Sequence, residues 1–204
     1  GKKMRQEIIK LPYLVLIVSL LLTLGATYIF YQNARAKDFT RFKSETSGLQ
    51  NRLEVSIGAY IAVIKAGRGF IGLSENLNRE KFAHFTSSME IPENYNGIQG
   101  IGYTRRIYDR DKDALIKKIR EEEGFPEFKI FPPEPARPEY HAIIYLEPPD
   151  ELNRRAIGFD MYSDASRREA MERARDTGKA AASARVTLVQ EIDDRKQAGF
   201  LIYL

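Results

Sequence analysis

The residue most suggestive of binding chemistry is Asp160, which stands in the apolar run Ala156-Ile157-Gly158-Phe159-Asp160-Met161-Tyr162. The run predicts a strand over 156–161, where an acid is disfavoured and where burial without a partner is costly. Asp160 therefore lies on a solvated face, or caps a helix that starts near Ser163, or accepts N–H donors from a ligand in a pocket. In the last case a ligand analogue without those donors loses about 1–3 kcal/mol of binding free energy. Residue types and spacing leave these alternatives open.

Side chains that suit catalysis or metal binding are few. His84 and His141 lack a second His, Asp or Glu at metal-site spacing. Glu121–Glu123 and Asp193-Asp194 are expected to be solvated charges at a helix end and a turn. The segment 72–76 lacks the second glycine of a nucleophile elbow, and the absence of cysteine excludes thiol catalysis and disulfides. We therefore predict no catalytic residue, no metal site and no cofactor in this chain.

A long uncharged segment near the N-terminus predicts a membrane anchor. Residues 11–34 are 24 consecutive residues without a formal charge, and a helix rising about 1.5 Å per residue would cross a hydrocarbon core of about 30 Å. Ala34-Arg35-Ala36 resembles a signal-peptide cleavage site, but the apolar run exceeds the usual core of about 7–15 residues. We expect residues 1–10 in the cytoplasm, an anchor in the inner membrane, and an exported part in the periplasm or outside the cell.

The positive net charge belongs to the flanks of this anchor. Of the 32 basic and 28 acidic residues, six basic and one acidic lie in residues 1–37, which leaves 26 and 27 and a net charge of −1 for the rest. Cations beside a span meet anionic lipid headgroups. A basic groove for nucleic acid is therefore not expected, and the membrane is the expected partner of these charges.

A heptad pattern follows the anchor. Apolar or small residues recur at alternating spacings of 3 and 4 at Phe39, Phe42, Thr46, Leu49, Leu53, Ser56, Tyr60 and Val63. The pattern predicts a helix over 35–67 that pairs with a second copy of the chain through a dimer seam of Phe39, Phe42, Leu49, Leu53 and Tyr60. The alternative is a single amphipathic helix that packs only within its own chain. Gly67-Arg68-Gly69 is the predicted end of the helix.

The remaining chain predicts an α+β fold with antiparallel sheets. Helices are expected over 78–89 and 111–122, and between a cap at Ser163 or Asp164 and a stop at Gly178. Strands are expected over 97–108, 128–131, 140–147, 156–161, 186–190 and 199–203. Neighbouring strands without helical crossovers favour antiparallel pairing.

Several stretches in fixed order resemble one known family. They are Gly97 to Tyr103, Tyr140 to Pro148, Asn153 with Ile157 to Asp160, Arg168-Glu169, Ala174 to Lys179, Leu188 and Gly199. In this succession, after an anchor and a long helix, the chain resembles the CHASE domain over roughly residues 70–204. CHASE domains are extracytoplasmic sensory modules found in front of histidine kinases, diguanylate cyclases and nucleotide cyclases.

The resemblance implies two PAS-like units above the long helix. We expect a membrane-distal sensor unit over 68–190 and the start of a membrane-proximal unit over 191–204, which is incomplete. A second membrane helix and a cytoplasmic output domain would be missing from this chain. The family often has Pro where Ala142 stands.

The resemblance also implies a ligand site. In the plant members, which are cytokinin receptors, the acid matching Asp160 hydrogen-bonds an adenine moiety, and a backbone group matching Ala182 does likewise. We expect the neighbouring residues to line the same site, namely Phe159, Tyr162, Tyr145 and Ser183.

Two functions follow as hypotheses. The first is a dimeric, membrane-bound receptor region that binds a small molecule of adenine or cytokinin type and signals to a cytoplasmic enzyme, while this fragment itself is not an enzyme. The alternative is an anchored module that recognises a protein or peptide, or only holds a dimer, without a small ligand. An enclosed pocket favours the receptor, and an exposed apolar patch favours the interaction module.

Overall fold

The computed structural model describes the backbone of residues 2–95, 97–187 and 198–204, and the side chains of 14–32, 46–95, 97–187 and 199–204. The chain divides into two compact units, Gly1–Val55 and Ser56–Leu204. The first unit is part of a single helix, and the second contains the sheets and the core.

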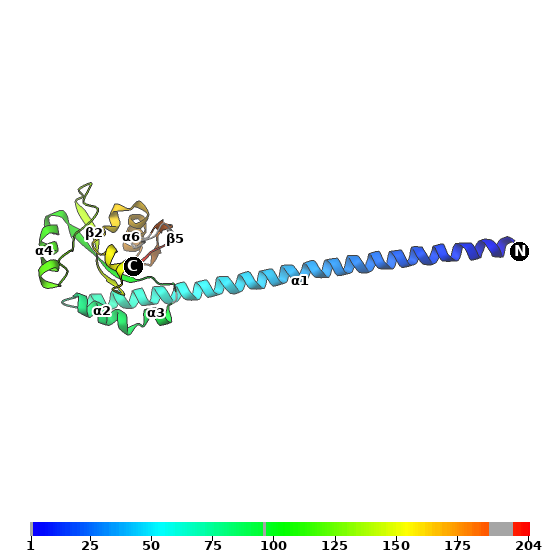
Figure 1. Ribbon diagram of the computed structural model, residues 1–204, viewed down its shortest axis with the longest axis horizontal. Coiled ribbons are helices and arrows are strands. Elements are labelled where there is room, and N and C mark those ends of the chain that lie inside the picture. The colour runs from blue at the N-terminus through cyan, green and yellow to red at the C-terminus, as the bar shows by residue number, and fades with distance from the viewer. Residues whose placement is uncertain (1, 96, 188–197) are drawn as a thin grey trace. The chain divides into compact units, whose positions relative to one another are not determined.

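Helix α1 (Lys2–Leu73) carries the candidate membrane span (Figure 1). Leu14–Gln32 has a mean hydropathy of 2.2 and no buried residue, so its apolar side chains are available to lipid. The hydroxyls of Ser19, Thr23 and Thr27 donate hydrogen bonds to backbone carbonyls three or four residues earlier. Such bonds satisfy polar groups where water is absent. The span lies within the predicted anchor 11–34.

The C-terminal part of α1 packs inside the second unit. Thr46–Leu73 is also long and apolar enough to cross a membrane, with a mean hydropathy of 1.2. However, Val63 is buried, and Phe70 stacks on Phe85 of α2 (Arg79–Ser88) with ring centroids 4.7 Å apart. We therefore interpret residues 56–73 as a helix of the globular unit.

The predicted end of this helix at Gly67 is wrong, because α1 continues to Leu73. A Cβ atom on Gly67 would lie in ordinary contact with the Phe85 ring, at 3.5 Å, so α1 packs against α2 at this position. The helix ends where the Ser74 hydroxyl donates a hydrogen bond to the carbonyl of Phe70.

A two-stranded antiparallel sheet organises the core. Strand β1 (Ile101–Tyr108) pairs with β2 (Glu139–Glu147), and a bulge separates Tyr103 from Thr104. Both strands were predicted. The segment before β1 is held by the buried Asn153, whose amide donates to the carbonyls of Gln99 and Pro148. A side chain at Gly100 would meet that amide at 3.0 Å, which explains a glycine at this close approach.

Three predicted helices are present. Helix α2 has Asn78 as its N-cap, α4 (Lys112–Glu122) follows the short η1 (Asp109–Asp111), and α6 (Ala165–Thr177) runs from an Asp164 cap to a left-handed Gly178. These boundaries confirm the expectations from capping residues. Sequence reasoning missed two short helices, α3 (Ile91–Asn94) and α5 (Glu151–Ala156).

The predicted strand over 156–161 is wrong, although the chain there does bridge two segments. Residues up to Ala156 belong to α5, and Met161–Ser163 form the 3-10 helix η2. Between them, Gly158 N–H donates to the carbonyl of Ile143 at 2.8 Å, while Gly158 O accepts from Phe131 N–H at 3.0 Å. Gly158 has φ +89°, a left-handed value that breaks any regular strand. Phe131, in the predicted strand 128–131, forms only an isolated bridge to Phe159 among the described residues.

Two small sheets complete the described fold. Strand β3 (Ala181–Ala182) pairs with β6 (Ile202–Tyr203), and β4 (Val186–Thr187) pairs with β5 (Ala198–Gly199), both antiparallel. The predicted strands 186–190 and 199–203 are therefore only partly reproduced, and residues 188–190 lie outside the described residues. Mixed helices and antiparallel sheets confirm the α+β class.

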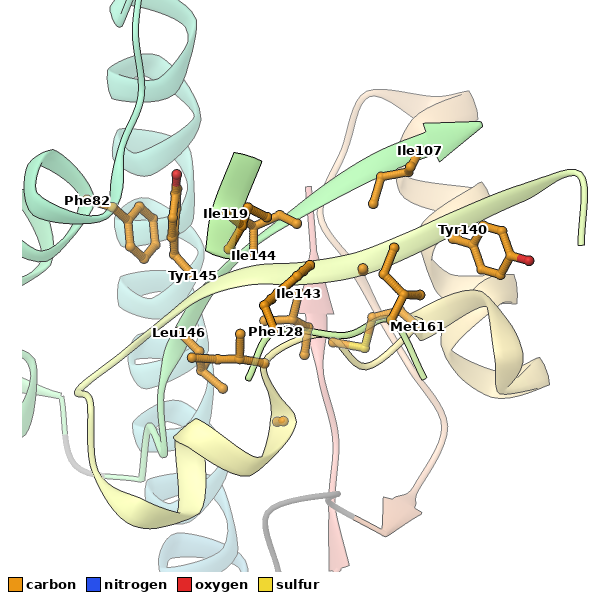
Figure 2. Packing of buried hydrophobic residues seen from close by; sticks show 14 residues of the cluster. Phe82, Ile107, Ile119, Phe128, Tyr140, Ile143, Ile144, Tyr145, Leu146 and Met161 are labelled. Carbon is orange, nitrogen blue, oxygen red and sulfur yellow. The ribbon is translucent and has the colours of Figure 1, made fainter. Parts of the chain in front are cut away.

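The buried cluster lies on β2 and its neighbours (Figure 2). Phe82 of α2 faces Tyr145 with ring centroids 5.6 Å apart, and Ile143, Leu146 and Met161 lie farther along the same cluster. Nearly all of β2 is buried, so the strand has no solvated face. It forms the centre of the second unit.

We expect Gly158→Ala to lower the free energy of unfolding by about 3 kcal/mol, because it adds left-handed strain and overpacking. The new Cβ would lie 2.0 Å from the carbonyl oxygen of Lys129. Gly124→Ala is the control: Gly124 has φ +66° but open space around it, so only about 1 kcal/mol should be lost. Chemical denaturation measures both, and equal losses would contradict the packing argument.

Candidate functional site

The Asp160 carboxylate is completely buried and held by groups of the chain itself. Its Oδ1 accepts hydrogen bonds from the backbone N–H groups of His141, at 2.7 Å, and Tyr162, at 3.1 Å. Its Oδ2 lies 2.8 Å from Nε of Arg137, an ion pair in which the N–H is not aligned for a hydrogen bond. Asp160 thus joins β2, η2 and the proline-rich loop before β2.

This geometry decides two of the three alternatives for Asp160. The solvated-face interpretation is wrong, because the side chain is 0% exposed. The capping interpretation is wrong for the helix that starts near Ser163, because Asp164 caps α6. Asp160 instead caps the short 3-10 helix η2. The role of Asp160 as a ligand acceptor stays a prediction, and such a ligand would have to share the carboxylate with these three internal partners.

Tyr162 and His141 stack beside Asp160. Their ring centroids are 3.6 Å apart, and His141 Nε2 lies 3.6 Å from Glu139, which accepts a hydrogen bond from Arg106 Nε at 2.7 Å. Burial lowers the pKa of His141 below its usual value, against the raising effect of the Glu139 carboxylate. Burial also raises the pKa of Tyr162, so both rings are neutral near pH 7.

Tyr145 lies in the hydrophobic cluster. Its hydroxyl donates to Glu123 Oε2 at 2.7 Å, and its ring contacts Phe82 and Tyr103. Burial raises the pKa of Tyr145, and the hydrogen bond to Glu123 acts in the same direction. Of the run predicted to be solvated, Glu121 and Glu122 are exposed, whereas Glu123 is partly exposed and accepts this hydrogen bond; Asp193 and Asp194 lie outside the described residues.

The other predicted ligand residues have partners of their own. The carbonyl of Ala182 accepts from Arg173 Nη2 at 2.7 Å, and Ala182 pairs with Ile202 across β3 and β6. The Ser183 hydroxyl donates to the carbonyl of Ala184 at 2.7 Å. The Phe159 ring packs edge-on against Phe131. Asp160, Phe159 and Tyr162 are neighbours, whereas Tyr145 and Ala182 belong to other elements.

A pocket of about 390 Å³ opens elsewhere in the second unit. None of the six predicted ligand residues lines it. Its wall combines the last part of α1, the segment before β1, the strands β1 and β2, and the C-terminal strands. The lining is mostly apolar or backbone and comprises Tyr60, Ile64, residues 97–102, Thr104, Ile143, Leu146, Ala156, Met161, Arg167 and residues 199–203.

The pocket contains a cation that sequence reasoning missed. Arg167 of α6 is 3% exposed and lines the pocket. No residue pattern revealed this burial, because it depends on where β4 and β6 pass the helix. Among the described residues, no group of three His, Asp or Glu side chains converges as a metal site.

The dimer seam is only partly within the described side chains. Phe39 and Phe42 lie outside them. Leu49 and Leu53 are 56% and 63% exposed. Tyr60 is half-buried, lies 6.5 Å from the Tyr95 ring and lines the pocket, so it packs within its own chain.

The described residues combine a helix that contains a candidate membrane span with a small α+β unit that contains a pocket. The family model for the CHASE domain matches residues 75–204, and the chain belongs to this family of extracytoplasmic, non-catalytic sensory domains. No curated protein matches the chain.

We expect Asp160→Ala to lower the free energy of unfolding by about 3–5 kcal/mol, because it leaves Arg137 without its buried counter-ion. Asp164→Ala is a matched control, since it removes a partly exposed capping carboxylate and should cost about 1 kcal/mol. Urea denaturation of both variants gives the comparison. Equal costs would mean that the buried pair does not stabilise the fold.

The buried His141 should make stability depend on pH. Its lowered pKa means that the unfolded chain binds more protons just below pH 6.5, so the free energy of unfolding falls as pH drops through that value. The loss between pH 8 and pH 5.5 should be smaller in His141→Gln. Glu147, whose pKa burial raises, titrates in both proteins and cancels in the comparison. Identical pH dependence in the two proteins would contradict this account.

Proposed function

We propose that this chain is the ligand-sensing region of a membrane-bound receptor and that a small molecule binds in the 390 Å³ pocket. The pocket itself is the observation that carries the proposal. Its volume lies in the range of small-molecule sites, and a few polar groups, among them Thr104 and Arg167, interrupt an apolar wall. Family membership supports sensing as its purpose.

The position of the pocket suggests how binding is transmitted. Tyr60 and Ile64 contribute to its wall, and both belong to α1, the helix that also contains the candidate span Leu14–Gln32. A ligand shifts a conformational equilibrium only through different affinities for two states. Ligand contacts with Tyr60 and Ile64 would make the affinity depend on the position of α1, so that binding favours one conformation of this helix.

Further features of the receptor are part of the proposal. The sensor would be PAS-like, anchored in the inner membrane, and followed by a second span and a cytoplasmic kinase or cyclase. The family resemblance implies that an adenine-type ligand binds at Asp160. Because that carboxylate already has three internal partners, we place the ligand in the pocket instead.

Exposed apolar side chains support self-association as a second property. Leu49, Leu53 and Val55 are more than half exposed on α1. Leu49 and Leu53 belong to the heptad seam, and burial of such residues drives helix pairing. We propose that two copies of the chain pair along this part of the helix.

The test of the pocket uses two neighbouring residues of α1. Ile64 lines the pocket and Lys65 is exposed and does not. Ile64→Trp should fill the site, whereas Lys65→Trp adds the same ring outside it. We expect a small molecule that co-purifies with the full chain in lipid nanodiscs, or is found by thermal-shift screening, to bind Ile64→Trp at least about tenfold more weakly, a loss of about 1.4 kcal/mol.

Native mass spectrometry and calorimetry measure this loss of binding. Lys65→Trp should bind like the unaltered chain. Equal binding by both variants would move the site away from the pocket. If no small molecule co-purifies or binds in the screen, the receptor proposal fails and the interaction module takes its place.

A further inference from the structure

Arg167 is a buried cation whose partners within the described residues are all uncharged. Its Nη2 donates to the carbonyl of Thr187 at 2.9 Å, and its Nη1 contacts the sulfur of Met161 at 3.7 Å. The guanidinium lies 4.8 Å from the centroid of the Phe159 ring. Its Nε has no hydrogen-bond partner among the described residues.

Arg137 has a carboxylate partner, whereas Arg167 has none among the described residues. Arg137 lies near the surface of the same unit and has the carboxylate of Asp160 at 2.8 Å. Arg167 is more deeply buried, and no described carboxylate forms an ion pair with it. Asp164, three residues earlier, accepts the backbone N–H of Arg167 at its Oδ1 at 2.9 Å. Burial lowers the pKa of Arg167, and the charge of Asp164 only partly opposes that effect. A buried guanidinium without a counter-ion is costly, so an external anion would be strongly favoured.

The surroundings of Arg167 restrict the chemistry of that anion. Most of the pocket wall is apolar, with Ile143, Leu146 and Ile101 among its residues. Tyr203 also lines the pocket; its hydroxyl contacts the sulfur of Met161 at 3.8 Å, and burial raises its pKa, so the group is neutral. One cation, a few neutral polar residues (Gln99, Thr104 and Tyr203) and an otherwise apolar wall match a ligand with one acidic group and a hydrocarbon or aromatic body.

We propose that the pocket binds a small monocarboxylate with an apolar body, whose carboxylate pairs with Arg167. This inference rests on the proposed function and specifies its ligand class. A single negative charge balances the one buried guanidinium. A doubly charged phosphate would leave an unbalanced charge in the same apolar surroundings, which is unfavourable.

The test compares Arg167→Met with Arg175→Met in the full chain in lipid nanodiscs, with empty nanodiscs as a blank. Arg175 lies on the same helix but is exposed and outside the pocket, so its variant makes the same charge change. The probes are benzoate, 3-phenylpropanoate and hexanoate, the amide of each, and adenine. Calorimetry gives affinities, and thermal unfolding gives stability.

We expect at least one carboxylate to bind the unaltered chain and Arg175→Met equally well. Its affinity should fall about tenfold to a hundredfold in Arg167→Met, as for the loss of a charge-assisted hydrogen bond, and its amide should bind at least about tenfold more weakly than the acid. Without ligand, Arg167→Met should unfold at the same temperature as the unaltered chain or higher, because a buried charge without a counter-ion is removed.

Other outcomes separate this inference from the proposed function. Equal binding of a carboxylate to Arg167→Met, or a lower unfolding temperature of that variant without ligand, would overturn the role of Arg167. Adenine or an amide could instead bind the unaltered chain and Arg167→Met but not Ile64→Trp. That result would overturn the carboxylate class, while the pocket would remain a ligand site. No binding by any probe would overturn the carboxylate inference, and the screen with Ile64→Trp then decides the proposed function.

Discussion

The buried carboxylate of Asp160 is the constraint on which the second unit depends. It ties the backbone of β2 at His141 to the start of η2 at Tyr162, and it balances the charge of Arg137 from the preceding loop. These contacts fix the path of the chain out of the core. Met161, the next residue, then lines the pocket, and α6 follows with Arg167. Asp160 therefore shapes the pocket without lining it.

Sequence reasoning was accurate where the signals are local. Asn78, Asp164 and Gly178 delimit helices through side-chain caps or a left-handed residue, and these interactions span only a few positions. It failed where a residue serves a distant partner. Gly67 suggested a helix end, yet it lies inside α1 where the helix packs against Phe85, and Gly158 turns an apolar run into an irregular bridge between Ile143 and Phe131.

The candidate site was harder to predict than the fold. The unusual place of Asp160 in an apolar run marked the residue but left a solvated face, a cap and a ligand pocket open; the folded structure shows that it is buried with backbone groups and Arg137 as partners. Arg167 gave no signal, because arginines on a charged helix are usually solvated. Its burial arises from tertiary contacts with Thr187 and Phe159. The folded structure distinguishes Arg137, which forms an ion pair with a carboxylate, from the buried Arg167, which has no such ion pair among the described residues.

The proposed sensing function requires a ligand site in contact with α1. The pocket is the candidate for that site, since Tyr60 and Ile64 of α1 and Tyr203 of β6 line it. The most direct measurement is an electron density map of the full chain, purified with its natural ligand, at a resolution that shows small molecules. The account predicts ligand density in the pocket with an acidic group beside the guanidinium of Arg167. Ligand density against the Asp160 carboxylate, with the pocket filled by side chains, would contradict it.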